Sequence, residues 1–282
     1  MYHVVKKRLL ATGIALLEVN APAVAAKVEP GQFVIVRVDE LSERIPLTVM
    51  DFDREKGTIT IVVQDVGYSS AIITRMNEGD KFQDFVGPLG VASEVENYGT
   101  VVCIGGGLGI APVHPIARAL KEAGNHVISV LGSRSADLLI LEDEMRAVSS
   151  EVVVATNDGS QGVKGFVTDG LAEVLAQGHQ VKAIWAIGPM IMMKAVVDYT
   201  RSLGIKTIVS MNPIMVDGTG MCGACRISVG NETKFACVDG PEFDGHLVDF
   251  DLAMKRLAFY KDEENQAKAR LECDCGKEGG HH

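Results

Sequence analysis

The stretch CIGGGLGIAP, residues Cys103–Pro112, decides how the middle of this chain folds. It begins inside the apolar run TVVCIGGG, which is typical of a buried parallel strand, and continues into IAPVHPIARALKEAG, whose pattern predicts a helix. The glycines allow a sharp turn and let a ligand approach the amides at the helix start, where phosphate binds well. A turn that binds nothing is the alternative for this loop taken alone. No Lys-Ser or Lys-Thr pair follows, which argues against a P-loop hydrolase.

Strands and helices alternate at short intervals after this loop. The sequence predicts strands over 126–134, 151–158, 182–189 and 206–211, and helices over 137–148, 167–178 and 190–204. This alternation favours a doubly wound parallel sheet. Ligands of such sheets bind at the carboxyl ends of the strands, so GSRS, Gly132–Ser135, and GPMIMM, Gly188–Met193, should share one crevice with the glycine loop. Met192 and Met193 themselves are expected in the core.

The residues before and after this alternation have different patterns. Short runs rich in Val and Ile, such as 32–38 and 57–66, are separated by Gly, Pro, Asp and Asn and predict a small antiparallel barrel. The first nineteen residues are interpreted as two strands and not as a signal peptide. After Asn212 come a cysteine-bearing segment and a helical pattern over 250–271. Three zones are therefore predicted: a barrel over 1–98, an α/β domain over 99–211, and a C-terminal segment, helix and tail over 212–282.

The composition narrows the class of protein. The chain has 282 residues, 47% of them hydrophobic, and a formal net charge of -10, so it can bury a core of two domains. An acidic chain without a basic stripe is a poor partner for nucleic acid or an anionic membrane. No run reaches the ~18 apolar residues of a spanning helix, so a cytoplasmic protein is expected. Six cysteines in a chain of this length indicate metal, redox chemistry or burial, not a disulfide scaffold.

Cysteines cluster near the end of the chain. MVDGTGMCGACR, Met215–Arg226, carries Cys222 and Cys225 in a glycine-rich loop, and Cys237 follows in FACVDGPEF. This spacing suits an iron–sulfur cluster. The many glycines of the loop would let backbone amides approach the sulfur atoms of such a cluster. Structural zinc remains the alternative. Cys103, inside a predicted buried strand, is expected to be a core residue.

Several motifs together resemble the ferredoxin-NADP reductase superfamily. The barrel, GGGLGIAP and IGPMIMM agree with it, RIPLTV and VGYSS are similar to its two flavin motifs, and GPLG resembles the turn that closes its barrel. The resemblance implies that Arg44 offers a planar donor fork to the flavin pyrophosphate. It also implies that Thr48 bonds the flavin ring and that Ser69 and Ser70 hold a phosphate at a helix start.

The residues that the resemblance implies for cofactor binding form two groups. Those in the barrel zone are Arg44, Pro46, Leu47, Thr48, Val62, Val63, Gln64, Gly67, Ser69 and Ser70. Those in the α/β zone are Gly105, Gly106, Gly107, Gly109, Ile110, Ala111, Pro112, Gly132, Ser133, Arg134, Asp158, Gly188, Pro189 and Met190. Ser133 and Arg134 could meet a 2′-phosphate, but four acids follow in DLLILEDE, so NAD is favoured over NADP. Hydride transfer needs no acid–base pair, and none is predicted.

Related proteins with a [2Fe–2S] segment, notably the electron-transfer subunit of dihydroorotate dehydrogenase, space their ligands C-x4-C-x2-C with a later fourth Cys. By this resemblance Cys222, Cys225 and Cys237 fill the second, third and fourth positions, and Asp217 falls on the first. Asp217 is the favoured fourth ligand, because its position in the spacing of the ligands is a stronger constraint than the ability of a flexible tail to reach the cluster. The alternative is that Cys273 or Cys275, in the tail, folds back.

VDGTGMCGACR and DGSQGVKGFVTD narrow the resemblance to the small (alpha) subunits of NADH-dependent reduced ferredoxin:NADP oxidoreductase, also called sulfide dehydrogenase, up to about Tyr260. This implies a flavoprotein subunit with FAD, NAD(H) and one [2Fe–2S] cluster, in an electron-bifurcating heterodimer with a larger flavin and [4Fe–4S] subunit. NADH would be the donor, and ferredoxin would exchange electrons through the complex. Two alternatives stay open: the dihydroorotate dehydrogenase electron-transfer subunit, and a non-redox, zinc-stabilised nucleotide-binding protein.

Overall fold

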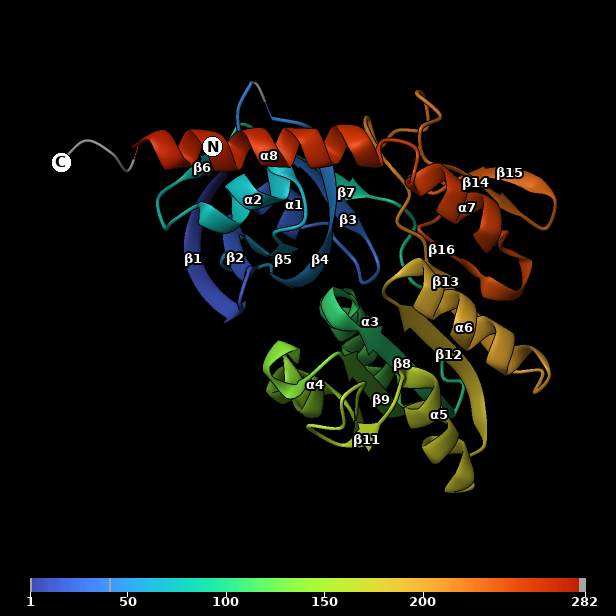
Figure 1. Cartoon of the computed structure of the whole chain (residues 1–282). Coiled ribbons are helices and arrows are strands. Elements are labelled where there is room, and N and C mark those ends of the chain that lie inside the picture. The colour runs from blue at the N-terminus through green and yellow to red at the C-terminus, as the bar shows by residue number, and fades with distance from the viewer. Residues whose placement is uncertain (1, 41, 279–282) are drawn as a thin grey trace.

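The computed structural model describes residues 2–40 and 42–278, with the side chains of the last helix described as far as Ala269. Three parts follow one another along the chain: a β-barrel, an α/β sheet and a small cysteine-bearing segment. Figure 1 shows the barrel in blue and cyan, the α/β part in green and yellow, and the C-terminal part in orange and red. None of the helices in the described part is long and apolar enough to cross a membrane.

The barrel is a seven-stranded antiparallel sheet in the order β6-β1-β2-β5-β4-β3-β7. Its outermost strands, β6 and β7, are consecutive in sequence, and the sheet is nearly closed. The predicted barrel and the two opening strands are confirmed. Alternate residues of facing strands, such as Leu17, Ile59 and Ile61, are fully buried inside it. The elements are β1 Tyr2–Ala11, β2 Ile14–Asn20, α1 Pro22–Ala25, β3 Phe33–Arg37, β4 Ile45–Asp53, β5 Thr58–Gln64, α2 Tyr68–Arg75, β6 Lys81–Phe82 and β7 Asp84–Leu89.

The second sheet has the order β11-β10-β9-β8-β12-β13-β16, and every neighbouring pair except β13–β16 is parallel. The chain runs outward from β8 on one side and restarts at β12 on the other, which confirms the doubly wound fold. The strand order therefore reverses between β8 and β12, where open α/β sheets bind ligands. The elements are β8 Thr100–Gly106, α3 Ile110–Glu122, β9 His126–Ser133, α4 Glu142–Val148, β10 Glu151–Thr156, β11 Val163–Lys164, α5 Val167–Ala176, β12 Val181–Ile187, α6 Met190–Arg201 and β13 Lys206–Ser210.

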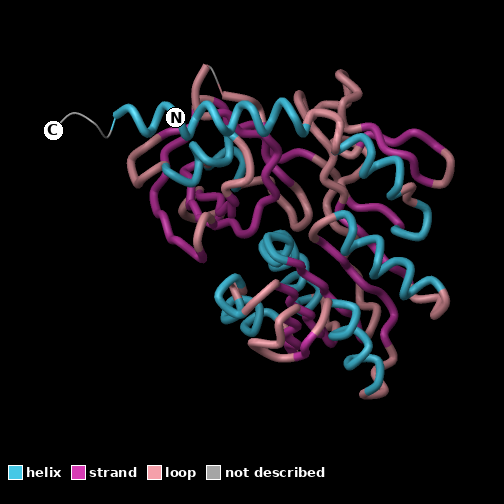
Figure 2. Tube along the Cα trace, in the orientation of Figure 1, coloured by secondary structure: helices cyan, strands magenta, loops and turns pink. Residues whose placement is uncertain are grey.

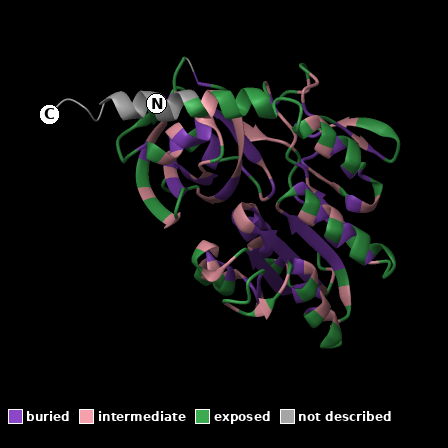
Figure 3. Cartoon of the chain, viewed as in Figure 1, coloured by how far each residue is buried: buried purple, intermediate pink, exposed green. Residues whose placement is uncertain are grey.

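Two cores lie on the two faces of this sheet. Helices α3 and α4 cover one face, where Ile116, Leu120 and Met145 pack with barrel residue Met50. Helices α5 and α6 cover the other face, in a core that continues into the cysteine-bearing segment through Cys225 and Cys237. Figure 3 shows the strands between these layers as almost wholly buried. Cys103 is fully buried on β8, which confirms it as a core residue.

The C-terminal part begins with an irregular loop between β13 and β14, drawn as loop in Figure 2. A two-stranded sheet of β14 and β15 follows, then the short strand β16 and two helices. The elements are β14 Arg226–Val229, β15 Glu232–Phe235, β16 Glu242–Asp244, α7 Phe250–Leu257 and α8 Lys261–Glu278. Helix α8 crosses over the barrel beside α2, where Lys268 Nζ lies 3.2 Å from Asp65 Oδ1.

The structure corrects four details of the sequence prediction. The helix predicted over 137–148 is α-helical only over α4, because Leu141 has a left-handed backbone, with φ of 57°, and is buried with Ile140. The helical pattern over 250–271 breaks at Ala258–Tyr260 into α7 and α8. GPLG is not a turn, since Gly87–Leu89 belong to β7. The second sheet is not wholly parallel, because β16 adds to its edge antiparallel to β13.

Candidate cofactor sites

A cleft of about 930 Å³ lies where the barrel faces the carboxyl ends of the parallel strands. Strand β4 lines it with Pro46, Leu47 and Thr48, and the end of β13 at Ser210 and the loop after it, at Met211, Asn212 and Met215, line it as well. Fifteen of the residues predicted to bind cofactors lie on its wall: Pro46, Leu47, Thr48, Val62, Gln64, Gly106, Gly107, Gly109, Ala111, Pro112, Gly132, Ser133, Arg134, Gly188 and Pro189. The tertiary structure thus brings the barrel motif and the glycine loop together.

The predicted phosphate end of the flavin site lies at the start of α2. Gly67 is the residue before the helix, and the Ser70 hydroxyl accepts from its amide at 2.9 Å and from the Val66 amide at 3.1 Å. The Ser69 hydroxyl accepts from the Glu43 amide at 3.2 Å. Both hydroxyls are therefore engaged within the chain, and the free donors at this end are the backbone amides of the first turn.

Arg44 follows Glu43, whose amide bonds Ser69 at this helix start, and it does not line the cleft. Its Nε atom is buried and has no hydrogen-bond partner among the described residues. A buried guanidinium donor without a partner is costly unless an anion meets it. The barrel residues therefore fit a pyrophosphate-bearing flavin, with Arg44 and the α2 amides at the phosphates and Thr48 on the wall of the cleft.

The glycine loop is packed so closely that Gly105 and Gly109, at its two ends, have no room for a side chain. A Cβ on Gly105 would lie 2.7 Å from the Ile110 Cα, and one on Gly109 would lie 2.1 Å from the Ile187 carbonyl oxygen. Gly107 differs, because its φ is +55° and a Cβ there would meet no atom within 4 Å. It borders the open cleft at the start of α3, so the loop fits a dinucleotide phosphate above Gly107.

Some predicted cofactor residues do not line the cleft. The side chains of Val63, Ile110 and Met190 are buried in the cores, and Asp158 uses Oδ1 to accept from the amide and hydroxyl of Ser160. The opposite error concerns Met192, which was expected in the core but lines the cleft, whereas Met193 is fully buried as predicted. The prediction also missed Asn157, Phe166 and Thr168 on the wall. Their position after β10 at the carboxyl edge was the available signal.

The cysteine-bearing loop brings together the predicted cluster residues. The Cys225 and Cys237 sulfurs are 3.2 Å apart and buried, while Cys222 is exposed. Burial, with a further contribution from the Cys225 thiol, raises the pKa of Cys237 to about 12. Two thiols this close can both bind iron, because the positive charge of the metal offsets the cost of ionising the buried Cys237.

Asp217 organises the same loop. Its Oδ1 accepts from the Thr219 amide at 2.8 Å and its Oδ2 from the Cys222 amide at 2.9 Å. The Thr219 amide, the Cys222 amide and the charge of Arg44 hold the pKa of Asp217 below its usual value. An ionised carboxylate bonded to the Cys222 amide fits a cluster ligand set of one oxygen and three sulfurs.

The loop also docks on the barrel. A Cβ on Gly218, whose φ is +76°, would lie 2.7 Å from the side chains of Ile35 and Leu89 on β3 and β7. Met215, two residues before Asp217, lines the cleft. The predicted cluster and flavin sites are therefore neighbours.

A single zinc ion fits these residues less well. Zinc needs its ligand atoms to converge on one point. Within the described part of the chain, three such atoms come within 4.8 Å of one another only at His126, Glu151 and His179, and not at the cysteines. A two-iron cluster spreads its four ligands over two metal atoms. The side chains of Cys273 and Cys275, the alternative ligands, lie outside the described residues.

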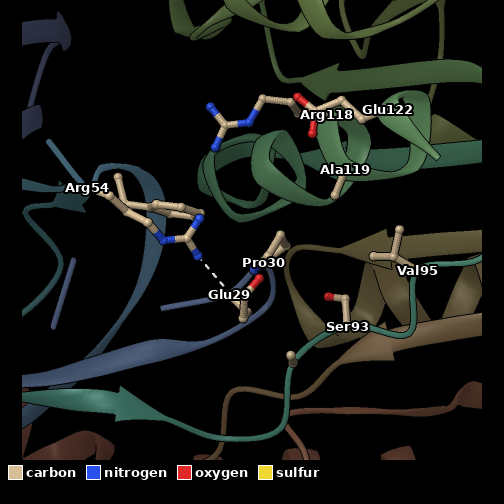
Figure 4. Close-up of a pocket in the computed structure, with 10 residues that line it drawn as sticks. Glu29, Pro30, Arg54, Ser93, Val95, Arg118, Ala119 and Glu122 are labelled. Atoms are coloured by element: carbon tan, nitrogen blue, oxygen red, sulfur yellow. Dashed lines mark hydrogen bonds and ion pairs between the residues drawn. The ribbon is translucent and has the colours of Figure 1, made fainter. Parts of the chain in front are cut away.

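A second cavity, of about 450 Å³, lies between the barrel and α3 on another side of the molecule (Figure 4). Arg54 and Arg118 stack on the Phe52 ring, but each is already paired with an acid: Arg54 with Glu29 at 2.8 Å and Arg118 with Asp51 at 2.6 Å. None of the predicted cofactor residues lines it. Its cations are neutralised, so it is not a second anion site.

Two family models match the chain in the places that the geometry singles out. The iron–sulfur cluster binding domain of dihydroorotate dehydrogenase B matches residues 212–249, and the oxidoreductase NAD-binding domain matches residues 103–198. The first match contains Asp217 and the three cysteines, and the second contains the glycine loop.

Relatives match over most of the chain. A Thermotoga maritima homologue of the dihydroorotate dehydrogenase B (NAD(+)) electron transfer subunit is 49% identical over 95% of this chain and 95% of its own. The Geobacillus thermodenitrificans electron transfer subunit is 34% identical over 85% of this chain and 94% of its own. A chain in the structure of NADH-dependent reduced ferredoxin-NADP oxidoreductase is 48% identical, with a TM-score of 0.92 over 96% of this chain and 98% of that one.

Proposed function

This chain belongs to the family of dihydroorotate dehydrogenase B electron transfer subunits and their homologues, and from that premise we propose its reaction and its partner. It is an oxidoreductase subunit that uses NAD(H), FAD and an iron–sulfur cluster. We propose that it passes electrons between NADH and a [2Fe–2S] cluster as the small subunit of an NADH-dependent reduced ferredoxin:NADP oxidoreductase.

One observation carries this proposal. A single cleft is lined by the β4 motif, by the glycine loop and by the loop that leads into Asp217 and Cys222. Two predicted sites at one cleft, with the predicted cluster loop reaching its wall at Met215, suit a short path from nicotinamide to flavin to cluster. FAD, when bound, exchanges two electrons with NADH and single electrons with the cluster.

The chain's own residues supply position and charge. The amides at Gly107 and the start of α3 bind the dinucleotide phosphates, and Arg44 binds the flavin phosphates. Thr48 orients the flavin ring from β4, and apolar wall residues such as Leu47 and Met192 exclude water from the reacting faces. Asp217, Cys222, Cys225 and Cys237 hold the cluster. No side chain needs to move a proton.

The relatives are subunits of heteromeric enzymes, which supports a larger partner subunit. We propose that this partner carries the bifurcating flavin and [4Fe–4S] clusters, exchanges electrons with ferredoxin and binds NADP. Met221 and Val238, both exposed on the cysteine-bearing segment, suit a docking face beside the cluster. The free thiols of Cys225 and Cys237 suit a reducing compartment, so we place the complex in the cytoplasm.

The test begins with the protein purified together with its natural partner. Under anaerobic conditions NADH should bleach the flavin absorption and then produce the electron paramagnetic resonance signal of a reduced [2Fe–2S] cluster. A colourless protein containing zinc would instead support the non-redox alternative.

The partner separates the two redox alternatives. The complex should reduce NADP with NADH and reduced ferredoxin together, and should show no NAD reduction with dihydroorotate. Dihydroorotate oxidation by the purified complex would assign it to pyrimidine synthesis and overturn the ferredoxin proposal. The Asp at the first ligand position, where the related clusters have Cys, supports the ferredoxin reading.

A further inference from the structure

His126, Glu151 and His179 come from three separate segments and meet on the surface. His126 begins β9, Glu151 begins β10, and His179 follows α5 after a turn at Gly178, whose φ is +87°. One potential ligand atom from each lies within 4.8 Å of the other two, the only such group among the described residues. None of the three lines the cleft.

The two imidazoles face the same carboxylate. His126 Nε2 lies 2.7 Å from Glu151 Oε1, and His179 Nε2 lies 3.7 Å from Glu151 Oε2. The two rings stack at 5.8 Å between centroids, with 23° between their planes. Ligand atoms of a tetrahedral zinc ion are about 3.3 Å apart, as follows from metal–ligand distances of about 2.0–2.1 Å. The two imidazole nitrogens lie 2.7 and 3.7 Å from the two oxygens of Glu151, on either side of that value, and one ligand atom of each residue lies within 4.8 Å of the other two.

We propose that His126, Glu151 and His179 form a binding site for a zinc ion. Two imidazole nitrogens and one carboxylate oxygen are ligands that zinc prefers, and the partial exposure of all three leaves a fourth position for water. Gln177 Oε1, 3.3 Å from His179 Nε2, accepts a hydrogen bond there when no metal is bound.

The site lies at the amino ends of β9 and β10, whereas the cleft lies at the carboxyl ends of the parallel strands. Zinc at this position contacts neither nicotinamide nor flavin. It joins the starts of two strands to the end of α5, so its effect is on the stability of the α/β domain and not on the rate of hydride transfer.

Metal counting on the cofactor-loaded full chain tests the proposal. His281 and His282, which lie outside the described residues, are deleted from every sample so that they do not compete. After equilibration with zinc sulfate and removal of free metal, we expect one zinc per chain by mass spectrometry. The His126→Ala/His179→Ala variant should lose this zinc, and Glu151→Gln should bind it at least tenfold more weakly. His3→Ala/His246→Ala, matched in histidine loss, should keep it.

Iron is counted in the same samples, because zinc could also enter an empty cysteine site. Zinc retained by His126→Ala/His179→Ala with its iron intact would overturn the proposal, as would zinc bound only in proportion to lost iron. Zinc should raise the melting temperature of the parent and not of the double histidine variant, and equal increases in both would contradict the site. Anomalous diffraction at the zinc edge should place the ion between the three side chains.

Discussion

Arg44 carries a buried Nε without a partner among the described residues, and this makes it the sharpest single-residue test of the flavin site. We predict that Arg44→Ala retains FAD roughly tenfold or more weakly, since a charge-assisted bond contributes about 1.5–3 kcal/mol. Flavin content after gel filtration measures this. Arg37→Ala is the matched control and should keep its flavin. Arg37 lies on β3 and is paired with Asp84 at 2.7 Å. Equal flavin in the two variants would contradict the role of Arg44.

Asp217 has two possible roles, as an iron ligand and as an acceptor that shapes the loop. We predict that Asp217→Cys keeps the cluster with a lowered potential, because a thiolate donates more charge than a carboxylate. Asp217→Asn keeps one acceptor oxygen for one of the two loop amides but is a poor ligand, so it should lose iron as Asp217→Ala does. Iron content and the resonance spectrum of the reduced protein measure both.

Substitution of the two tail cysteines tests the alternative that one of them, and not Asp217, is the fourth cluster ligand. Cys273→Ser and Cys275→Ser should leave iron content and spectrum unchanged. A loss of signal in either one, with Asp217→Ala unaffected, would move the fourth ligand from Asp217 to the tail. A cluster preserved in Asp217→Asn but not in Asp217→Ala would assign Asp217 to shaping the loop alone.

At the scale of elements, the turn from β8 to α3 needs Gly107 for two separable reasons. Its φ is +55°, which strains any side chain, and it faces the open cleft. We predict that Gly107→Ala weakens NADH binding about tenfold or more while flavin stays bound, because a methyl group occupies phosphate space. Gly204→Ala tests strain alone, since Gly204 has φ of +64°, no atom within 4 Å of a Cβ, and a place in the turn after α6. Stopped-flow flavin reduction by NADH distinguishes them, and equal rates would make the loop only structural.

Strand β16 attaches the cysteine-bearing segment to the parallel sheet and carries a buried acid. Glu242 accepts from the Ser93 hydroxyl at 2.6 Å and from the Trp185 indole at 3.3 Å. Although these bonds lower it, burial raises the pKa of Glu242 from 4.5 to about 7. The carboxyl of the folded chain thus stays protonated over a range in which the unfolded chain ionises.

The free energy of unfolding should therefore fall as pH rises from 4.5 to about 7, by up to roughly 3 kcal/mol, and stay low above that range. Glu242→Gln has no proton to lose and should remove this part of the pH dependence, raising the melting temperature above pH 7 relative to the parent. Glu232→Gln, at an exposed acid paired with Lys234, is the control. Identical melting profiles for the parent and Glu242→Gln would refute the assignment.

At the scale of the whole molecule, the cleft exists only while the barrel and the α/β domain keep their relative position. Arg118 on α3 joins them by its pair with Asp51 on β4 and by lying 5.5 Å from the centroid of the Phe52 ring. We predict that Arg118→Ala lowers the free energy of unfolding by about 1 kcal/mol, after discounting for exposure. Arg146→Ala, which breaks an exposed pair with Glu142 inside α4, should change it by less than about 0.5 kcal/mol. Chemical denaturation measures both, and equal losses would show that the domain contact adds nothing special.

The sequence by itself determined the class of fold and the chemistry of the loops. Period-two runs of Val and Ile can only bury one face by forming a barrel or sandwich, and the alternation after Thr100 requires helices on a parallel sheet. Glycine positions and cysteine spacing are local constraints. The phosphate loop CIGGGLGIAP and the predicted cluster ligands Asp217, Cys222, Cys225 and Cys237 could therefore be predicted without knowing any tertiary contact. These predictions depend on neighbours in sequence.

Tertiary structure decided what depends on distant residues. Leu141 lies outside the helix with a left-handed backbone and is buried in the core that α3 shares, a contact between residues distant in sequence. Strand β16 was unrecognised, since three residues carry no period and its pairing with β13 is long-range. The same holds for Met192 in the cleft. It also holds for His126, Glu151 and His179, which are separated by more than twenty residues each and meet because β9 pairs with β10 and α5 packs against both strands. Side-chain sites of this kind are products of packing, and no local pattern encodes them.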